Sequence, residues 1–265
     1  MRGYLKSITI SFALALLLSG SALADSFNLR PVYTGGSTLD TLQSVFTGIG
    51  STIDVRTDQS GAAIFTNQTS GSNAAYVASL SWDAENTPFI FGIYESGNPD
   101  NKVPIFVDNT NGTGQSNPGD WTTINFDFIG GMIYSEYHDA GTMGSTVVGS
   151  TSDWMNAFGF YFSYDTLGGV ATFYSQDSLN QVGASALTFL GKGDAVNIAG
   201  LPGNDANHWY VAMEGWGTAG AAPDFTDIVV QMESVVPVSA PEPGTLLLFG
   251  TGLGALGIIR YRRKR

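Results

Sequence analysis

The chain has 265 residues, no cysteine and a formal net charge of −12. This length is enough for one sizeable domain with its own hydrophobic core, and the absence of cysteine excludes a fold held together by disulfides. The acidic balance argues against a nucleic-acid-binding protein, because an acidic surface repels the phosphate backbone.

The first 24 residues have the organisation of a Sec signal peptide. Two basic residues precede an apolar segment over residues 8–18, and Ala22 and Ala24 then form an A-x-A cleavage site. This order of basic, apolar and small residues is typical of exported proteins. We therefore expect the Sec translocon and signal peptidase to process residues 1–24, which leaves Asp25 as the first mature residue.

The segment between the two ends is more acidic than the whole chain. Residues 25–240 contain four basic and 22 acidic residues, a formal charge of −18. Two interpretations of this surface stand at this point. It either keeps the protein soluble outside the cell or serves a dedicated cation-binding role.

Residues 37–50 predict one short helix near the start of the mature chain. Apolar residues recur there at helical spacing, a serine or threonine can cap the start, and two glycines end the pattern. The apolar stripe consists of Leu39, Leu42, Val45, Phe46 and Ile49. We expect this stripe to pack into the core.

After the helix the pattern changes to short segments rich in β-branched and aromatic residues, separated by turn residues. The predicted strands are residues 53–57, 62–66, 76–82, 89–94, 103–107, 122–128, 158–164, 170–174, 186–190, 208–214 and 228–235. Composition predicts loops at 96–102, 108–120 and 138–153. The fold class is therefore mainly β, an antiparallel β-sandwich or jelly-roll-like domain over residues 25–236, with a linker at 237–240.

A four-residue pattern of the form F-G-x-Y occurs twice, at residues 91–94 and 158–161. One interpretation is a duplicated half-domain. The other is that each glycine marks a bulge or a close approach of backbone inside a buried strand.

No local motif for catalysis is present. The chain has only two histidines, His138 and His208, and lacks the nucleophile elbow, phosphate-binding loop, dinucleotide fingerprint and zinc-protease patterns. A Ser-His-Asp triad or a carboxylate pair for sugar hydrolysis is defined by geometry, and nothing in the sequence singles one out. We expect a protein that is not an enzyme, with a glycan-active enzyme as the least favoured alternative.

The last predicted hairpin of the body carries the most informative acidic residues. If its two strands pair, Glu214, Asp224 and Asp227 converge at one edge of the sheet. Three carboxylates brought together repel unless a cation or a proton intervenes, and oxygen ligands on a loop suit Ca²⁺. The alternative is that these are solvated acids that cap turns.

A second resemblance covers most of residues 40–235 and rests on residues 53–59, 91–94, 158–161, 173–175 with Asn180, and the closing acids Glu214, Asp224 and Asp227. In these segments the body is similar to the domain-of-unknown-function 4114 family of secreted bacterial proteins. Gly215, Thr226 and Ala222 or Pro223 stand where the family pattern has further oxygen ligands. The resemblance implies a β-rich surface domain and assigns no reaction.

The last 25 residues have three parts in a fixed order. Pro241, Glu242 and Pro243 are followed by an apolar run over 244–259, and Arg260, Arg262, Arg263, Lys264 and Arg265 end the chain. The 16-residue run is about 24 Å long as a helix, which is short for a bilayer core of about 30 Å. The basic end predicts a cytoplasmic C-terminus.

This tail resembles the PEP-CTERM sorting signal of Gram-negative bacteria over residues 241–265. In that family an exosortase processes the tail, in species that make exopolysaccharide. The resemblance implies transient inner-membrane retention by a hydrophobic C-terminal helix, followed by delivery to the cell surface or extracellular matrix. The alternative is a plain C-terminal membrane anchor.

The expected function is that of an exported surface or exopolysaccharide-matrix protein. A calcium-assisted carbohydrate-binding or adhesion module is the alternative, since Trp121, Trp154 and Trp216 can stack on sugar rings if they are exposed. These tryptophans are equally compatible with a place in the core.

Overall fold

A computed structural model describes the chain over residues 38–67, 71–82, 87–108, 116–127, 129–140, 145–152, 154, 157–166, 168–181, 184–215 and 223–238. The chain divides into two compact units, and every described residue belongs to the unit Asp25–Val238.

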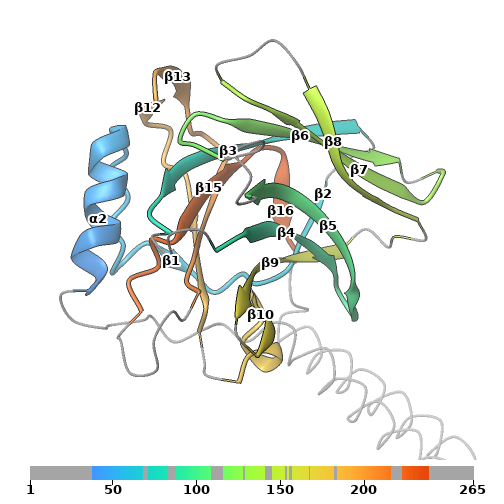
Figure 1. Ribbon diagram of the computed structural model, residues 1–265. Coiled ribbons are helices and arrows are strands. Elements are labelled where there is room, and N and C mark those ends of the chain that lie inside the picture. Colours follow the sequence, from blue (N-terminus) through green and yellow to red (C-terminus); the bar gives the residue numbers. More distant parts are fainter. Residues whose placement is uncertain are drawn as a thin grey trace, which may run out of the picture. The chain divides into compact units, whose positions relative to one another are not determined.

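The described part contains one α-helix, one 3₁₀ turn and a series of strands (Figure 1). They are α2 (Thr38–Ile49), β1 (Gln59–Ser60), β2 (Phe65–Asn67), β3 (Gly71–Leu80), β4 (Phe89–Glu95), β5 (Asn98–Asp108), β6 (Trp121–Asp127), β7 (Met132–His138), β8 (Ser145–Thr151), β9 (Ala157–Thr166), β10 (Gly169–Tyr174), η2 (Asp177–Leu179), β11 (Ala186–Leu190), β12 (Ala195–Ile198), β13 (Leu201–Asn204), β14 (Trp209–Met213), β15 (Ile228–Met232) and β16 (Val235–Pro237).

The strands form two large antiparallel sheets and one small hairpin. The first sheet has the order β1-β11-β14-β15-β3-β6-β7-β8, and the second has the order β16-β2-β9-β4-β5 with β10 paired to β9. Strands β12 and β13 pair only with each other among the described elements. The prediction of a mainly β, antiparallel fold is therefore confirmed.

The main core lies between the two sheets, since its buried residues come from alternate positions on strands of both. Strand β14 contributes Trp209, Val211 and Met213, which share one face as the period of two requires. Strand β9, in the other sheet, contributes Phe158, Phe160, Phe162 and Tyr164. The two sheets therefore pack face to face as a sandwich.

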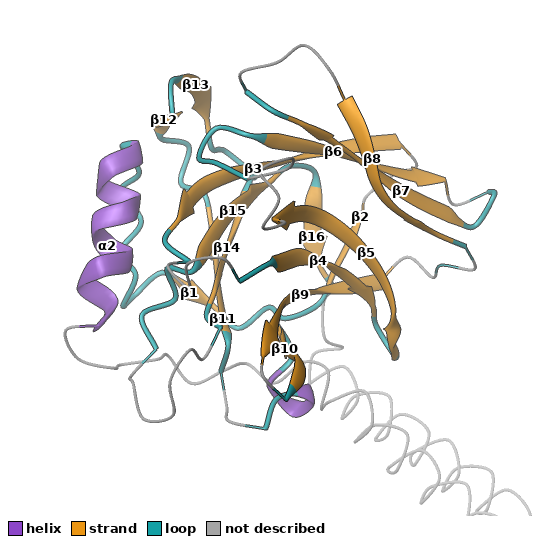
Figure 2. Cartoon of the chain, in the orientation of Figure 1, coloured by secondary structure: helices purple, strands orange, loops and turns teal. Residues whose placement is uncertain are grey.

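Helix α2 covers part of the outer face of the first sheet (Figure 2). Its residues Leu39, Leu42 and Phe46 are fully buried, and Phe46 makes edge-on ring contacts with Phe189 of β11 and Tyr210 of β14, at centroid distances of 5.1 Å each. The helical stripe expected from the sequence is therefore confirmed as core packing.

The two F-G-x-Y segments lie on adjacent central strands and face each other in reverse. In the pairing of β4 with β9, Gly92 lies opposite Tyr161 and Tyr94 lies opposite Gly159. A Cβ on Gly92 would be 2.6 Å from Cε1 of Tyr161, and a Cβ on Gly159 would be 2.6 Å from Cε1 of Tyr94. Each glycine therefore makes room for the tyrosine ring of the other segment, so the expected close approach is confirmed.

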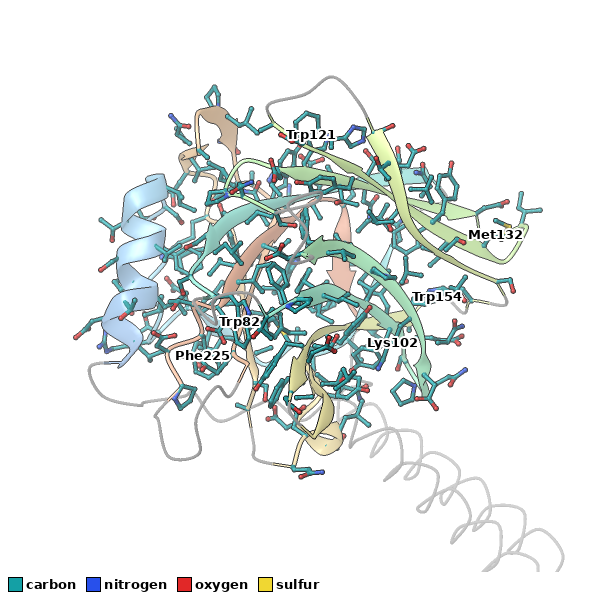
Figure 3. The ribbon with its side chains drawn as sticks, viewed as in Figure 1. Trp82, Lys102, Trp121, Met132, Trp154 and Phe225 are labelled. Carbon is teal, nitrogen blue, oxygen red and sulfur yellow. The ribbon has the colours of Figure 1, made fainter. Side chains whose placement is uncertain are left out.

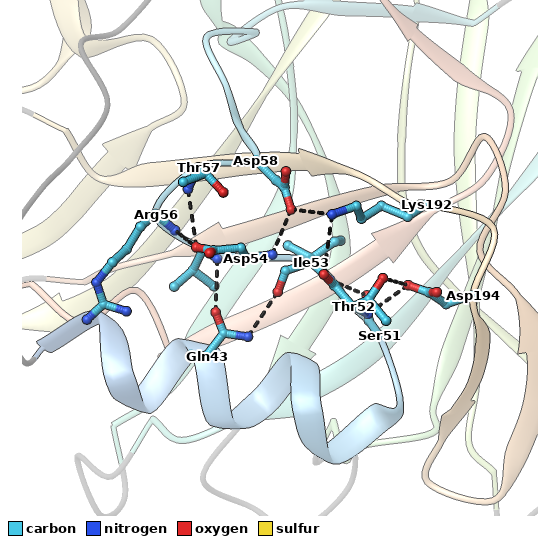
Figure 4. A network of polar contacts seen from close by, with 11 residues as sticks. Gln43, Ser51, Thr52, Ile53, Asp54, Arg56, Thr57, Asp58, Lys192 and Asp194 are labelled. Atoms are coloured by element: carbon cyan, nitrogen blue, oxygen red, sulfur yellow. Dashed lines mark hydrogen bonds and ion pairs between the residues drawn. The ribbon is translucent and has the colours of Figure 1, made fainter.

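Residues 53–57, expected as a strand, form a loop held by side chains (Figure 4). The Oδ1 atom of Asp54 accepts hydrogen bonds from the backbone N–H groups of Arg56 and Thr57, at 2.8 and 3.3 Å. Gln43 of α2 bonds the carbonyl of Ile53 and the N–H of Val55. Because these side chains satisfy the backbone locally, it is not free to join a sheet.

Strands β7 and β8 were not predicted, and β8 falls inside the segment expected as a loop at 138–153. Strand β8 reads Ser-Thr-Val-Val-Gly-Ser-Thr, a composition typical of loops. It forms a strand because it pairs with β7, from His138 opposite Ser145 to Ile133 opposite Thr151. The ladder to β7, rather than local preference, decides its structure.

The last predicted strand, 228–235, is broken in two. The chain leaves the first sheet after β15, turns at Ser234 with a φ of 54°, and enters the second sheet as β16. Val238 then donates its backbone N–H to the carbonyl of Ile64 at 3.0 Å. The compact body therefore extends to Val238, into the segment expected as a linker at 237–240.

Candidate functional site

The three acids expected to converge lie where β14 and β15 end. Met213 is the last residue of β14 and pairs with Ile228, the first residue of β15. Glu214 and Asp227 are the next residues outward on the two strands, so the ladder brings their backbones opposite each other. Asp224 lies on the chain that leads into β15. The predicted gathering at this edge is therefore observed.

Each of the three carboxylates bonds to nearby backbone or hydroxyl groups. Oε2 of Glu214 accepts from the N–H groups of Asp224 and Phe225, at 3.0 and 2.8 Å. Oδ2 of Asp227 accepts from the N–H of Gly215 at 2.5 Å. Oδ1 of Asp224 accepts from the N–H and hydroxyl of Thr226, at 3.1 and 2.7 Å. These bonds tie the two sides of the hairpin end together.

The electrostatics of the site centre on Glu214. Burial, followed by the charges of Asp227 and Asp224, raises the pKa of its carboxyl to about 8, against the two backbone N–H bonds that lower it. Glu214 is therefore mainly protonated at neutral pH. A proton thus relieves the repulsion among the three acids.

Aromatic side chains from β9 and from the segment that follows β3 border this cluster. The ring of Trp82 lies 4.5 Å from that of Tyr164 and 5.3 Å from that of Phe162, measured between centroids. Burial, and then the charges of Asp227 and Glu214, raises the pKa of the Tyr164 hydroxyl. A Cβ on Gly215 would be 2.6 Å from Cε1 of Phe162, so this position has no room for a side chain.

Phe225 has an unusual backbone conformation for a buried aromatic residue. Its φ is 58° and its side chain is fully buried in the cluster under α2. The bond that the N–H of Phe225 donates to Glu214 and the two bonds that Thr226 donates to Asp224 hold this turn. Figure 3 shows Phe225 and Trp82 among the side chains of the body. The acids therefore have a clear structural role in fixing the entry to β15.

The described residues contain no assembled metal site. Among them, no group of three or more His, Cys, Asp or Glu side chains is arranged to hold a metal ion. One carboxylate oxygen of each of the three acids accepts hydrogen bonds from backbone N–H or hydroxyl groups of the protein itself. The calcium hypothesis for Glu214, Asp224 and Asp227 stays a prediction that requires these bonds to rearrange.

The residues predicted for export and sorting lie outside the described residues. They are Ala22, Ala24, Pro241, Glu242, Pro243, Arg260, Arg262, Arg263, Lys264 and Arg265. Within the described ranges, no helix is both long and apolar enough to cross a membrane.

The tryptophans proposed to stack on sugars differ in their surroundings. Trp154 is buried, with 6% of its surface exposed. Trp121 is half-buried and stacks on His138 at a centroid distance of 5.1 Å and an interplanar angle of 9°, well away from Trp82 (Figure 3). Trp216 lies outside the described residues. Of the two that are described, only Trp121 offers accessible ring surface.

Sequence analysis did not single out two buried carboxylates that organise loops. Asp205 is fully buried, and its Oδ1 accepts from the N–H groups of Gly193 and Asp194, at 2.8 and 2.7 Å. Its Oδ2 accepts from the hydroxyl of Tyr210 at 3.2 Å. Asp120, also buried, accepts from the hydroxyl of Tyr137 at 2.5 Å. No local motif marks either position, because the donors come from other strands and loops.

Comparisons with known proteins give one informative match. The family model described as the PEP-CTERM protein-sorting motif matches residues 239–264. No curated protein and no solved structure matches the chain. The resemblance of residues 40–235 to the domain-of-unknown-function 4114 family gains no support from these comparisons. The sorting motif implies that the chain is exported, processed by an exosortase and associated with the surface.

Proposed function

We propose that this chain is a non-enzymatic, exported protein of the cell surface or exopolysaccharide matrix of a Gram-negative bacterium. The observation that carries the proposal is the sorting motif at residues 239–264. In this proposal the apolar run at 244–259 forms a hydrophobic helix that holds the protein in the inner membrane until the exosortase acts. The folded body is the delivered product.

The properties of the body support delivery to an aqueous environment outside the cell. Residues 25–240 carry a formal charge of −18, which favours solubility and opposes self-association. The chain has no cysteine, so its stability rests on its cores rather than on disulfides. The core between the sheets is rich in phenylalanine, and its burial is the main stabilising contribution.

The test of the proposal is deletion of residues 244–265 in a host that contains an exosortase. We expect the deleted chain to be exported but to miss the processing step, so that it remains in the periplasm or is released unprocessed. Substitution of Pro241, Glu242 and Pro243 by alanine should impair processing while the helix is kept. Surface display and product size that are the same as for the wild type would overturn the proposal.

A calcium-assisted carbohydrate-binding or adhesion module is the second candidate. The observation that favours it is the gathering of Glu214, Asp224 and Asp227 at one hairpin end. Trp121, whose ring is partly accessible, is a candidate for stacking on a sugar. Titration of Ca²⁺ into the body, followed by calorimetry, tests this candidate directly.

A further inference from the structure

The last described strand anchors the chain immediately before the sorting motif. Strand β16 pairs with β2, with Val235 opposite Asn67, Val236 opposite Thr66 and Pro237 opposite Phe65. Val235 is 2% exposed and belongs to the core between the sheets. Val238 packs against the outer cluster of Ile64, Tyr94 and Tyr161 and bonds the carbonyl of Ile64. The body therefore holds the chain up to Val238.

This anchoring leaves a very short tether to the residues that are processed. Only Ser239 and Ala240 separate Val238 from Pro241. Three residue steps of fully extended chain span about 10 Å. A body of this length has a radius of gyration of about 17 Å. The tether is thus shorter than the radius of the body, so an enzyme that binds the motif must work within about 10 Å of Val238.

The structure of β16 allows the tether to lengthen. The strand has three residues and lies at the edge of the second sheet, so it pairs with β2 alone. It begins after Ser234, whose φ of 54° is a strained conformation for a residue with a side chain. If the chain were released as far as Ser234, seven residue steps would separate Pro241 from the body. The greatest possible distance between the two would then be about 24 Å.

We propose that β16 detaches from β2 when the sorting motif enters the processing enzyme. After processing, the β16 segment either pairs with β2 again or remains unpaired at the end of the mature chain. This inference rests on the proposed function, since it concerns access of the exosortase to its motif. Parts of a folded domain can open locally at a free energy below that of global unfolding, while the rest of the domain stays folded. In this role β16 positions the motif and takes no part in the cleavage itself.

The test is to lock β16 to β2 with a disulfide. The variant Thr66→Cys/Val236→Cys places cysteines at the central pair of the ladder, where the spacing of opposed strand residues suits a disulfide. The chain has no cysteine of its own, so no other pairing competes, and the bond forms in the oxidising compartment outside the inner membrane. We expect processing of the locked variant in an exosortase host to be slower by at least about tenfold.

Two matched variants separate loss of reach from loss of folding. The control Ser72→Cys/Asn125→Cys cross-links β3 to β6 at an opposed pair far along the chain from the motif, and should be processed at the wild-type rate. Insertion of six glycine and serine residues after Val238 in the locked variant adds about 20 Å of reach. It should restore processing, while the melting temperature shows that each variant is folded.

The outcomes distinguish this inference from the proposed function. A locked variant that is processed at the wild-type rate overturns detachment of β16, as does a locked variant that the insertion fails to rescue. A wild-type chain that the exosortase host leaves unprocessed overturns the proposed function, and this inference with it.

Discussion

Substitution of Glu214 by glutamine should remove a specific pH dependence of stability. The pKa of this carboxyl rises from an ordinary value of 4.5 to about 8 in the folded protein. Between these two values the folded protein keeps a proton that the unfolded chain has released. The free energy of unfolding therefore falls as pH rises through this interval, and levels off above pH 8.

The size of the effect follows from the same interval. Each pH unit corresponds to about 1.4 kcal/mol, which sets a ceiling of about 5 kcal/mol for the whole interval. Glu214 is only half-buried, and solvent screens its repulsion with Asp227 and Asp224. We therefore expect a measured loss of about 1–2 kcal/mol between pH 5 and 9.

Glutamine preserves the part of the side chain that holds the hairpin. Its carbonyl oxygen can accept the same bonds from the N–H groups of Asp224 and Phe225. Glutamine is neutral at every pH. The free energy of unfolding of Glu214→Gln should therefore equal that of the wild type near pH 5 and exceed it by about 1–2 kcal/mol at pH 9.

The assay is urea unfolding of residues 25–238, monitored by tryptophan fluorescence at pH values from 5 to 9. Asp100→Asn, which removes an exposed acid on β5, is the matched control and should run parallel to the wild type at every pH. The difference between variant and wild type cancels every other titration that the two share. A Glu214→Gln curve that is also parallel to the wild type would refute the assignment of the proton to this carboxyl.

Three further predictions concern packing, buried charge and metal binding. Gly92→Ala should destabilise the body by about 1–3 kcal/mol in urea unfolding, because the added Cβ overlaps the Tyr161 ring. The control Gly203→Ala has open space around the added Cβ and should destabilise the body by less than about 1 kcal/mol. Asp205→Ala should cost at least about 2 kcal/mol in the same assay, since it leaves a buried tyrosine hydroxyl and two partly buried N–H bonds without their acceptor. If the calcium hypothesis is right, calorimetric titration of Ca²⁺ should give heat with the wild-type body and none with Asp224→Ala/Asp227→Ala, and an absence of heat with both would reject it.

The sequence was most informative where local pattern and final environment agree. The helix at 37–50 is observed as α2 with its boundaries nearly unchanged, because one apolar stripe and two terminal signals point to the same structure. The strand predicted at 186–190 is β11, since its apolar residues face both a core and a helix. In both cases the secondary structure that the local sequence favours places the apolar residues where the fold buries them.

The failures occur where partners distant in the chain decide the structure. Strand β8 depends on its ladder to β7, and the loop at 53–57 depends on side chains of Gln43 and Asp54. The break after β15 arises because the chain changes sheets there, which no periodicity records. Hydrophobic pattern therefore predicts that a segment is buried more reliably than it predicts which sheet it joins.

The candidate site was predicted in part for the same reason. A hairpin brings its own ends together, so the meeting of Glu214, Asp224 and Asp227 followed from the predicted pairing of two adjacent strands. Trp82 follows β3 and Tyr164 lies on β9, both far away in the chain, and no motif links them to these acids. The raised pKa of Glu214 depends first on burial, and is therefore visible only in the folded structure.

The two F-G-x-Y segments pair in antiparallel fashion, and this pairing favours one register between β4 and β9, the two central strands of the second sheet. A slip of two residues in one direction would set Tyr94 against Tyr161, and a slip in the other would set Gly92 against Gly159. The first error crowds two rings into one space and the second leaves a hole, whereas a slip of one residue turns every side chain to the wrong face. Only the native alignment pairs each ring with an empty position. The centre of this acidic domain thus specifies its own strand alignment through shape alone, without any charged group.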